Sequence, residues 1–321
     1  WVRASIIDFE LTSRLGFTHV ASGAAAGAHV WHMEFQSGSP PRSTYQPLVH
    51  MVRPGIDSFR AQLDLVNGYA DLRGDRADEI LAQMGGAGGF FASIPFIRPE
   101  RTPRTMELLS AALRLANHVE MRFKHALACR RPNEFSPQVQ PMILTPSHGT
   151  LPSGHATEAF ITAITLWQLL SAPYPDATPC LPPYADREWA RQLLRLAARV
   201  AINRTVAGVH FPVDSAAGAL LGITLGHYLV ARCTHAGQYD AWKFDGTSYP
   251  APAQGDPPPW DGDFYWHALI DPATLARTEA RQASATTSAK YAARNGAQTL
   301  AAAGRSPVLK WLWDEAKGEW T

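Results

Sequence analysis

Residues 145–160 read TPSHGTLPSGHATEAF, and this stretch combines a tight turn with the start of a helix. The turn is the Pro-Ser-Gly at 152–154, and the apolar side chains after it recur at helical spacing to about residue 171. Two histidines, His148 and His155, flank the turn seven residues apart. The stretch therefore places two titratable side chains at the mouth of a predicted helix.

Helical periodicity dominates the sequence from about residue 102 onward. The Thr-Pro pair at 102–103 is typical of a helix start, because threonine caps the first turn and proline fits the first helical position. The predicted helices cover residues 102–129, 154–171 and 187–204, and a fourth begins near residue 212.

Strand signals are sparse by comparison, and the run AHVWHMEF at 28–35 is compatible with a strand or a helix. We therefore predict an all-α fold, a helical bundle that forms a single domain over residues 1–321. The proline- and glycine-rich stretch 248–264 is expected to be irregular. The core of the bundle is expected at about 103–232, with helical and coil flanks at 1–102 and 233–321.

The composition sets limits on the partners. Lysine and arginine total 29 against 28 acidic residues, so nothing electrostatic favours nucleic acid or an anionic membrane. The three cysteines, at 129, 180 and 233, fit neither a paired metal site nor an even disulfide framework. The chain opens on Trp1, so a processed leader is compatible with it and the sequence assigns no compartment.

The most apolar run, SAAGALLGITLGHYLVA at 215–231, is slightly shorter than the roughly 20 residues that cross a bilayer. Gly218, Gly222 and Gly226 fall on one face of the predicted helix, which favours close packing against another helix in the core. No membrane partner is predicted. Apolar helices allow a homodimer, as is common for enzymes.

Three separated segments carry the chemistry. In the first, KHALACRRP, Lys124 and Arg131 are seven residues apart, so on a helix both cations lie on nearly one face, roughly 10 Å apart along the axis. They can then converge on one anion. The alternative is that Lys124 pairs with Glu120 one turn earlier and Arg131 is a solvated helix end.

The second segment is the PSGH sequence. Ser153 and Gly154 lie where the helix begins, so the free amides of the first turn favour a bound anion, and Gly154 allows close approach of the backbone to a ligand. The alternative is that Ser153 is only a helix cap and His155 a polar first-turn residue.

The third segment, NRTVAGVHFPVD, contains Arg204, His210 and Asp214. An acid four residues after a histidine can hold one ring nitrogen and leave the other free as a nucleophile or metal ligand. Asp214 can instead complement the start of the next helix. Together the segments supply three cations, an amide nest and two histidines, which suits a tetrahedral oxyanion bonded to histidine.

The order and internal spacing of these motifs resemble the superfamily that joins vanadium-dependent haloperoxidases to type 2 phosphatidic acid phosphatases and bacterial class A acid phosphatases. The pattern is lysine, six residues, Arg-Pro; then PSGH; then arginine, five residues, histidine, three residues, aspartate. Many members have serine where this chain has Asn203. The motifs cover about 90 residues.

The resemblance implies the role of each matching residue. His210 is implied to be the vanadium ligand of a peroxidase or the phosphorylated residue of a phosphatase, Asp214 its orienting partner, and His155 the general acid and base. Vanadate is the implied cofactor, and phosphate fits the same site. The oxygens of either anion are implied to be held by Lys124, Arg131, Ser153, Gly154 and Arg204.

His148 lies five residues before Ser153, a position that in the resembling haloperoxidases faces the cofactor and is typically histidine in bromoperoxidases. The resemblance therefore favours a haloperoxidase that oxidises bromide or iodide with hydrogen peroxide, with Lys124 polarising the peroxide, and halogenates a small organic acceptor. The alternatives are a phosphomonoesterase with a phosphohistidine intermediate, and a protein that only binds anions. In isolation, His148 is equally compatible with a surface hydrogen-bonding role.

Overall fold

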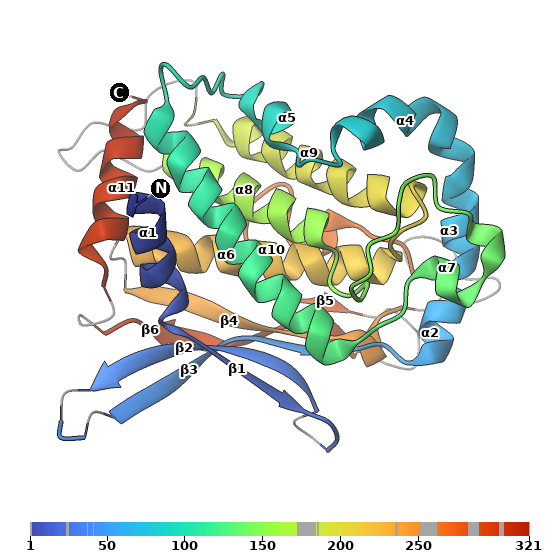
Figure 1. The fold of residues 1–321 in the computed structure, drawn as a ribbon, viewed down its shortest axis with the longest axis horizontal. Helices are drawn as coiled ribbons and strands as arrows, with labels where there is room; N and C mark the ends of the chain where they lie inside the picture. The colour runs from blue at the N-terminus through green and yellow to red at the C-terminus, as the bar shows by residue number, and fades with distance from the viewer. Residues whose placement is uncertain are drawn as a thin grey trace.

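The computed structural model describes residues 2–23, 26–36, 38–40, 42–171, 184, 186–234, 237–250, 262–281, 289–301 and 305–320. The helices form a layer, a twisted sheet lies along one side of it, and both chain ends lie at one end of the molecule (Figure 1). Cys180 and most of the predicted irregular stretch 248–264 lie outside the described residues.

The helical core confirms the four predicted helices. Helix α8 contacts the other three, and its first turn is the PSGH segment. Apolar side chains at helical spacing drive this packing, because burying each large side chain contributes about 1.5–3 kcal/mol. The four are α6 (Pro103–Leu127), α8 (Gly154–Ser171), α9 (Arg187–Val206) and α10 (Pro212–Thr234).

The glycines of α10 allow it to lie directly against α8, as the sequence predicts. A Cβ atom added at Gly218 would lie 2.5 Å from the Ser153 carbonyl oxygen, and one at Gly226 would lie 2.8 Å from Ile164 Cβ. Among the described residues, α10 is the one helix long and apolar enough to match a membrane span, and 89% of its most apolar window is buried by the protein.

The expectation of an all-α fold is wrong, because the chain also forms a six-stranded mixed sheet in the order β1-β2-β3-β4-β6-β5. All neighbouring strands are antiparallel except β3 and β4. The ambiguous run at 28–35 is inside the second strand. The strands are β1 (Leu15–Val20), β2 (Gly27–Gln36), β3 (Arg42–Val52), β4 (Gln238–Asp245), β5 (Ala280–Arg281) and β6 (Lys290–Thr299).

The parallel pair explains why a helical prediction fails here. Val49 of β3 is in register with Trp242 of β4, so the sheet joins segments from opposite ends of the chain. The sheet covers α10 through β4. Its inner residues, such as Trp242 and Phe244, are buried by that helix layer. No local sequence pattern encodes such a pairing.

The remaining helices cover the layer and extend it. The end of α4 lies against α9 and brings Gln83 to the functional motifs. The C-terminal helix packs on α6. These helices are α1 (Val2–Thr12), α2 (Ile56–Ala61), α3 (Leu63–Tyr69), α4 (Arg73–Ala82), α5 (Gly88–Ala92), α7 (Pro132–Phe135) and α11 (Pro307–Gly318).

Candidate active site

His210 lies at the centre of the site, just before α10, with its ring fixed on one side. Its Nδ1 is 3.0 Å from Thr150 Oγ1 and 3.2 Å from Asp214 Oδ2. The Thr150 hydroxyl donates to Asp214 Oδ2 at 2.5 Å, so its oxygen is left to accept a proton from Nδ1. This network places the ring proton on Nδ1. The lone pair of His210 therefore lies on Nε2, on the opposite side of the ring.

The electrostatic environment keeps His210 neutral. Its imidazole is buried, and burial together with the positive charges of Lys124 and Arg131 holds the pKa of His210 well below its usual range. Asp214 is fully buried, and burial raises its pKa to about 6, while hydrogen bonds from Thr150 and the Phe211 amide oppose that rise. Asp214 is thus ionised at neutral pH, and a neutral His210 Nε2 is available as a nucleophile or ligand.

Arg131 links His210 to the loop before α8. Its Nη1 donates to the Val209 carbonyl at 2.8 Å and lies 3.5 Å from His210 Nε2. Its Nε donates to the His148 carbonyl at 3.1 Å. The Arg131 charge therefore lies beside the free nitrogen of His210, as an anion site requires.

The His148 ring lies against the same guanidinium. Its Nδ1 is 3.2 Å from Arg131 Nη2 and 3.1 Å from the Gly149 carbonyl. Arginine can only donate, so the contact with Arg131 needs an unprotonated Nδ1. The contact with the Gly149 carbonyl needs a protonated Nδ1. Burial lowers the pKa of His148. A neutral His148 can thus accept from Arg131.

Lys124 is buried on α6 beneath the loop. Its Nζ donates to the Pro152 carbonyl at 2.5 Å and lies 3.4 Å from the carbonyls of Gly149 and Thr150. Glu120, one turn earlier, makes no ion pair with Lys124 among the described residues, although its charge favours the protonated lysine. Burial lowers the pKa of Lys124 to about 8. The pairing with Glu120 considered from the sequence is therefore replaced by a lysine anchored on three loop carbonyls.

Arg204, on α9, is a buried cation of this site with unused donors. Its Nη2 donates to Gln83 Oε1 at 3.1 Å, whereas its Nε and Nη1 have no partner among the described residues. Asn203, the departure from the family pattern, donates to the same Gln83 oxygen at 3.0 Å. A buried unpaired donor costs about 1–3 kcal/mol, more when charged. Two such donors on one guanidinium point to an oxyanion as the missing partner.

The PSGH turn differs in detail from the expectation. The Ser153 amide donates to the Asp214 carbonyl at 2.9 Å, so it is engaged in joining the turn to α10. A Cβ atom at Gly154 would lie 2.6 Å from Glu120 Oε1, so in this structure the glycine makes room for a carboxyl group. The Ala156 amide donates to Ser153 Oγ at 3.4 Å and the Thr157 amide to the Ser153 carbonyl at 3.0 Å, so Ser153 does cap the helix. The amides of Gly154 and His155 are the first-turn donors that remain for an anion.

His155 follows in the first turn of α8. Its Nε2 donates to the Gln83 carbonyl at 3.1 Å, which leaves Nδ1 as the nitrogen able to accept a proton. Burial first, and then the charge of Arg204, lowers the pKa of His155 to about 4. A bound dianion would oppose both effects and raise that pKa, so His155 can act as an acid when the site is loaded.

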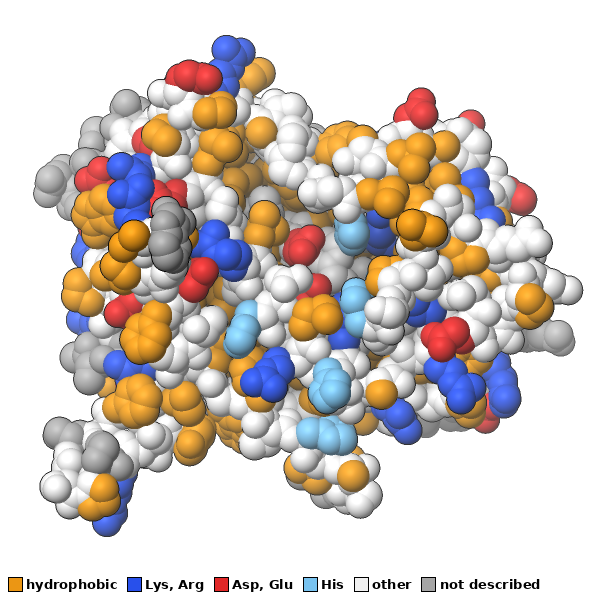
Figure 2. Space-filling model, viewed as in Figure 1, with side chains coloured by type: hydrophobic (Ala, Val, Ile, Leu, Met, Phe, Trp, Pro, Cys, Tyr) orange, Lys and Arg blue, Asp and Glu red, His pale blue; other side chains and the backbone are white. Residues whose placement is uncertain are grey.

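A cavity of about 280 Å³ adjoins His155. Glu158, one turn along α8, is its second titratable group, and burial raises the pKa of Glu158. The other walls are apolar side chains and a glycine-rich loop. Figure 2 shows that this face of the molecule is hollowed near its centre, where histidine and charged side chains gather. The remaining lining residues include Phe91, Leu109, Leu113, Val200 and residues 85–88.

The structure thus brings together the nine residues singled out from the sequence. Sequence reasoning missed Thr150, Gln83 and Glu158. Thr150 lies inside the quoted motif stretch, three residues before Ser153, and a hydroxyl so near two histidines is a usable signal. Glu158 also lies in that stretch, three residues after His155 and so on the same helix face. Gln83 carries no motif, because its relevance comes from the packing of α4 on α9.

Comparison with known proteins identifies the domain. Residues 106–237 match the PAP2 superfamily model, so the chain contains a PAP2 superfamily domain that includes all the site motifs. A similar solved structure is a transmembrane PAP2-type phosphatidylglycerolphosphate phosphatase from Bacillus subtilis. The two share 16% identity at a TM-score of 0.33, over 56% of this chain and 85% of that one. No curated protein matches the sequence.

Proposed function

We propose that the protein is a phosphomonoesterase that works through a phosphohistidine on His210. The observation that carries the proposal is the orientation of His210: Thr150 and Asp214 hold Nδ1, and Nε2 faces a buried arginine. The PAP2 superfamily includes phosphatases and haloperoxidases. The resemblance implies that this histidine is phosphorylated in the phosphatases and binds vanadium in the haloperoxidases. A histidine activated as a nucleophile is most directly explained by the transfer of a phosphoryl group to it.

In the proposed reaction, His210 Nε2 attacks phosphorus and the bond from phosphorus to the ester oxygen breaks. The leaving oxygen takes a proton from His155, and water then attacks the phosphohistidine while His155 accepts a proton from it. Lys124, Arg131 and Arg204 neutralise the charge that spreads over the transferred oxygens. Arg204 suits this task, because two of its donors are otherwise unused.

The cavity beside His155 supports the phosphatase over the haloperoxidase, in reverse of the preference drawn from the sequence. The group that leaves a phosphomonoester is organic and must lie next to the acid that protonates it. The cavity of about 280 Å³ at His155 accommodates such a group, because most of its walls other than His155, Glu158 and Thr162 are apolar. We therefore expect substrates with a compact apolar alcohol or phenol.

The test is hydrolysis of p-nitrophenyl phosphate whose phosphoryl group carries an isotopic label, so that the phosphohistidine intermediate can be trapped. His210→Ala should abolish both turnover and trapped label. His155→Ala should reduce turnover and let the label accumulate, because the acid and base are lost. His125→Ala is the matched control, since His125 is exposed on α6 next to Lys124. Full turnover by His210→Ala would refute the mechanism.

A second candidate function is vanadate-dependent haloperoxidase activity, and the placement of His148 favours it. His148 lies on Arg131, at the position where the resembling bromoperoxidases have histidine. The unused Arg204 donors fit vanadate as well as phosphate. His210 would be the protein ligand of vanadium, as the resemblance implies, because its Nδ1 is engaged and its Nε2 is free. Bound vanadate would supply activation of hydrogen peroxide for halide oxidation.

One parallel assay separates the two candidates. Metal-stripped protein is given hydrogen peroxide with bromide, iodide or chloride, before and after addition of orthovanadate, beside the phosphatase assay. Bromination that requires vanadate and is suppressed by phosphate would establish the peroxidase. His148→Phe should then change halide preference or the pH profile. Phosphatase turnover that vanadate inhibits, together with no halide oxidation, would exclude the haloperoxidase.

A further inference from the structure

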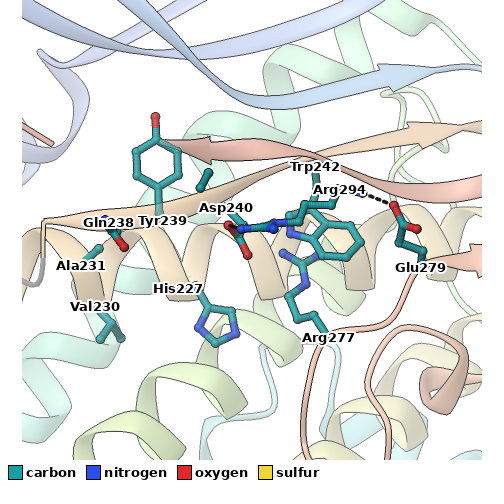
Figure 3. Close-up of a pocket in the computed structure, with 11 residues that line it drawn as sticks. His227, Val230, Ala231, Gln238, Tyr239, Asp240, Trp242, Arg277, Glu279 and Arg294 are labelled. Atoms are coloured by element: carbon teal, nitrogen blue, oxygen red, sulfur yellow. Dashed lines mark hydrogen bonds and ion pairs between the residues drawn. The ribbon is translucent and has the colours of Figure 1, made fainter. Parts of the chain in front are cut away.

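A larger cavity, of about 870 Å³, lies between α10, β4 and β6, away from the PAP2 motifs. Its helix-side titratable residue is His227, thirteen residues beyond Asp214 on α10, which is about 20 Å along the axis. Figure 3 shows side chains from α10, the strands and the segment before β5 around this space. Its lining includes Val230, Ala231, Asp240, Trp242, Arg277, Glu279 and Arg294.

Arg277 is the unusual member of this cavity. Its guanidinium carbon lies 3.7 Å from the centroid of the Trp242 ring, and its Nη1 donates to Thr224 Oγ1 at 3.0 Å. Stacking and this hydrogen bond fix the plane of the guanidinium. Its Nε and Nη2 atoms are buried and have no partner among the described residues. The buried indole nitrogen of Trp242 also has none.

The two acids of the cavity are already paired with other cations. Asp240 accepts from Arg294 Nη2 at 2.6 Å, and Glu279 pairs with Lys290. Among the described residues, no carboxylate lies within ion-pair distance of Arg277. Burial and the charge of Arg277 lower the pKa of His227 to about 4, so His227 is neutral at pH 7. Arg277 is therefore the cation of this cavity that has no acidic partner among the described residues.

We propose that this cavity is a second ligand site, which binds an organic carboxylate through the side-on Nε and Nη2 pair of Arg277. Two parallel N–H groups match the two oxygens of a carboxylate. One negative charge balances the one unpaired cation, whereas a phosphate dianion would add charge beside Asp240 and Glu279. The apolar wall formed by Val230 and Ala231, together with Trp242, suits a ligand with an aromatic or aliphatic body.

The first test uses the unaltered protein and isothermal titration calorimetry with phenylacetate, phenylacetamide and inorganic phosphate. Phenylacetate should bind with one site per chain and at least about tenfold more tightly than its neutral amide, because the amide loses the charge-assisted pair. Binding should persist when orthovanadate saturates the PAP2 site. Equal affinity for acid and amide, no binding, or displacement of phenylacetate by orthovanadate would overturn the proposal.

The second test places the site at Arg277. Arg277→Gln should weaken phenylacetate binding about tenfold or more, while phosphatase turnover stays unchanged. Arg294→Gln is the matched control. Arg294 is a half-exposed arginine of the same cavity, and its guanidinium is already paired with Asp240. The control variant should keep most of the affinity. If Arg277→Gln binds phenylacetate as the parent protein does, the site is not the one proposed. The acid-against-amide comparison stands even if this variant fails to fold.

Discussion

Replacing Gly218 with alanine should impair the PAP2 site by displacing the Ser153 backbone, without changing any side chain implied to hold the anion. The added Cβ would lie 2.5 Å from the Ser153 carbonyl oxygen, where ordinary contacts begin near 3.4 Å. The start of α8 must therefore move by about 0.9 Å. Overpacking of this kind costs about 1–3 kcal/mol of unfolding free energy. A displacement of about 1 Å at catalytic groups costs about 100-fold in rate.

The assay compares kcat/KM for p-nitrophenyl phosphate with urea unfolding of the same preparations. Gly226→Ala is the control, because its Cβ would meet Ile164 at 2.8 Å in the same helix pair, two turns farther from Ser153. Both variants should lose similar stability, and only Gly218→Ala should lose about two orders of magnitude in kcat/KM. If the two lose activity equally, the distance between α8 and α10 does not set the site geometry.

Three further predictions concern the polar groups of the site. The pKa of unliganded His155 is about 4 and a bound dianion raises it, so binding of sulfate, which is a dianion at pH 6, should take up protons. Calorimetry in buffers of different ionisation enthalpy should show less uptake in His155→Gln, and equal uptake would contradict the role of His155. Asp214→Asn should lower turnover about 10²–10⁴-fold, because Nδ1 of His210 loses its anionic acceptor. Vanadate affinity, measured by titration, should fall by less. Losses of the same size in turnover and affinity would count against the role of Asp214 in orienting His210. Gln83→Ala should cost about 1–3 kcal/mol in urea unfolding, because Arg204 and Asn203 lose their shared acceptor, and unchanged stability would exclude Gln83 as a buried hydrogen-bonding partner.

The four core helices are predictable because their signals are local. The Thr-Pro start of α6 and the apolar spacing of α8 need only neighbouring residues to be recognised. The sheet was missed for the opposite reason. Strand β6 reads KYAARNGAQT, which has little β-branched or aromatic character, so its pairing with β4 comes from tertiary context.

The site divides in the same way. His210 and Asp214 meet because four residues separate them across the start of α10. Lys124 and Arg131 do not lie on one helix face as expected, because α6 ends at Leu127 and Arg131 lies at the start of α7. Both cations instead meet at the loop before α8. Gln83 lies far from these motifs in sequence, yet it meets Arg204 through α4 and α9. Nothing in its immediate neighbours marks a glutamine as a shared acceptor, so that contact follows only from the fold.

The parallel pair of β3 and β4 has a consequence for synthesis on the ribosome. The antiparallel meander of β1, β2 and β3 is synthesised before the helical core. The edge of β3 that pairs with Trp242 and its neighbours in β4 stays open until that core has been made. At about 5–20 residues per second, that delay is on the order of ten seconds or more. An unpaired strand edge is a template for self-association. Nascent chains stalled before β4 should therefore depend on chaperones, whereas chains released after β4 should not.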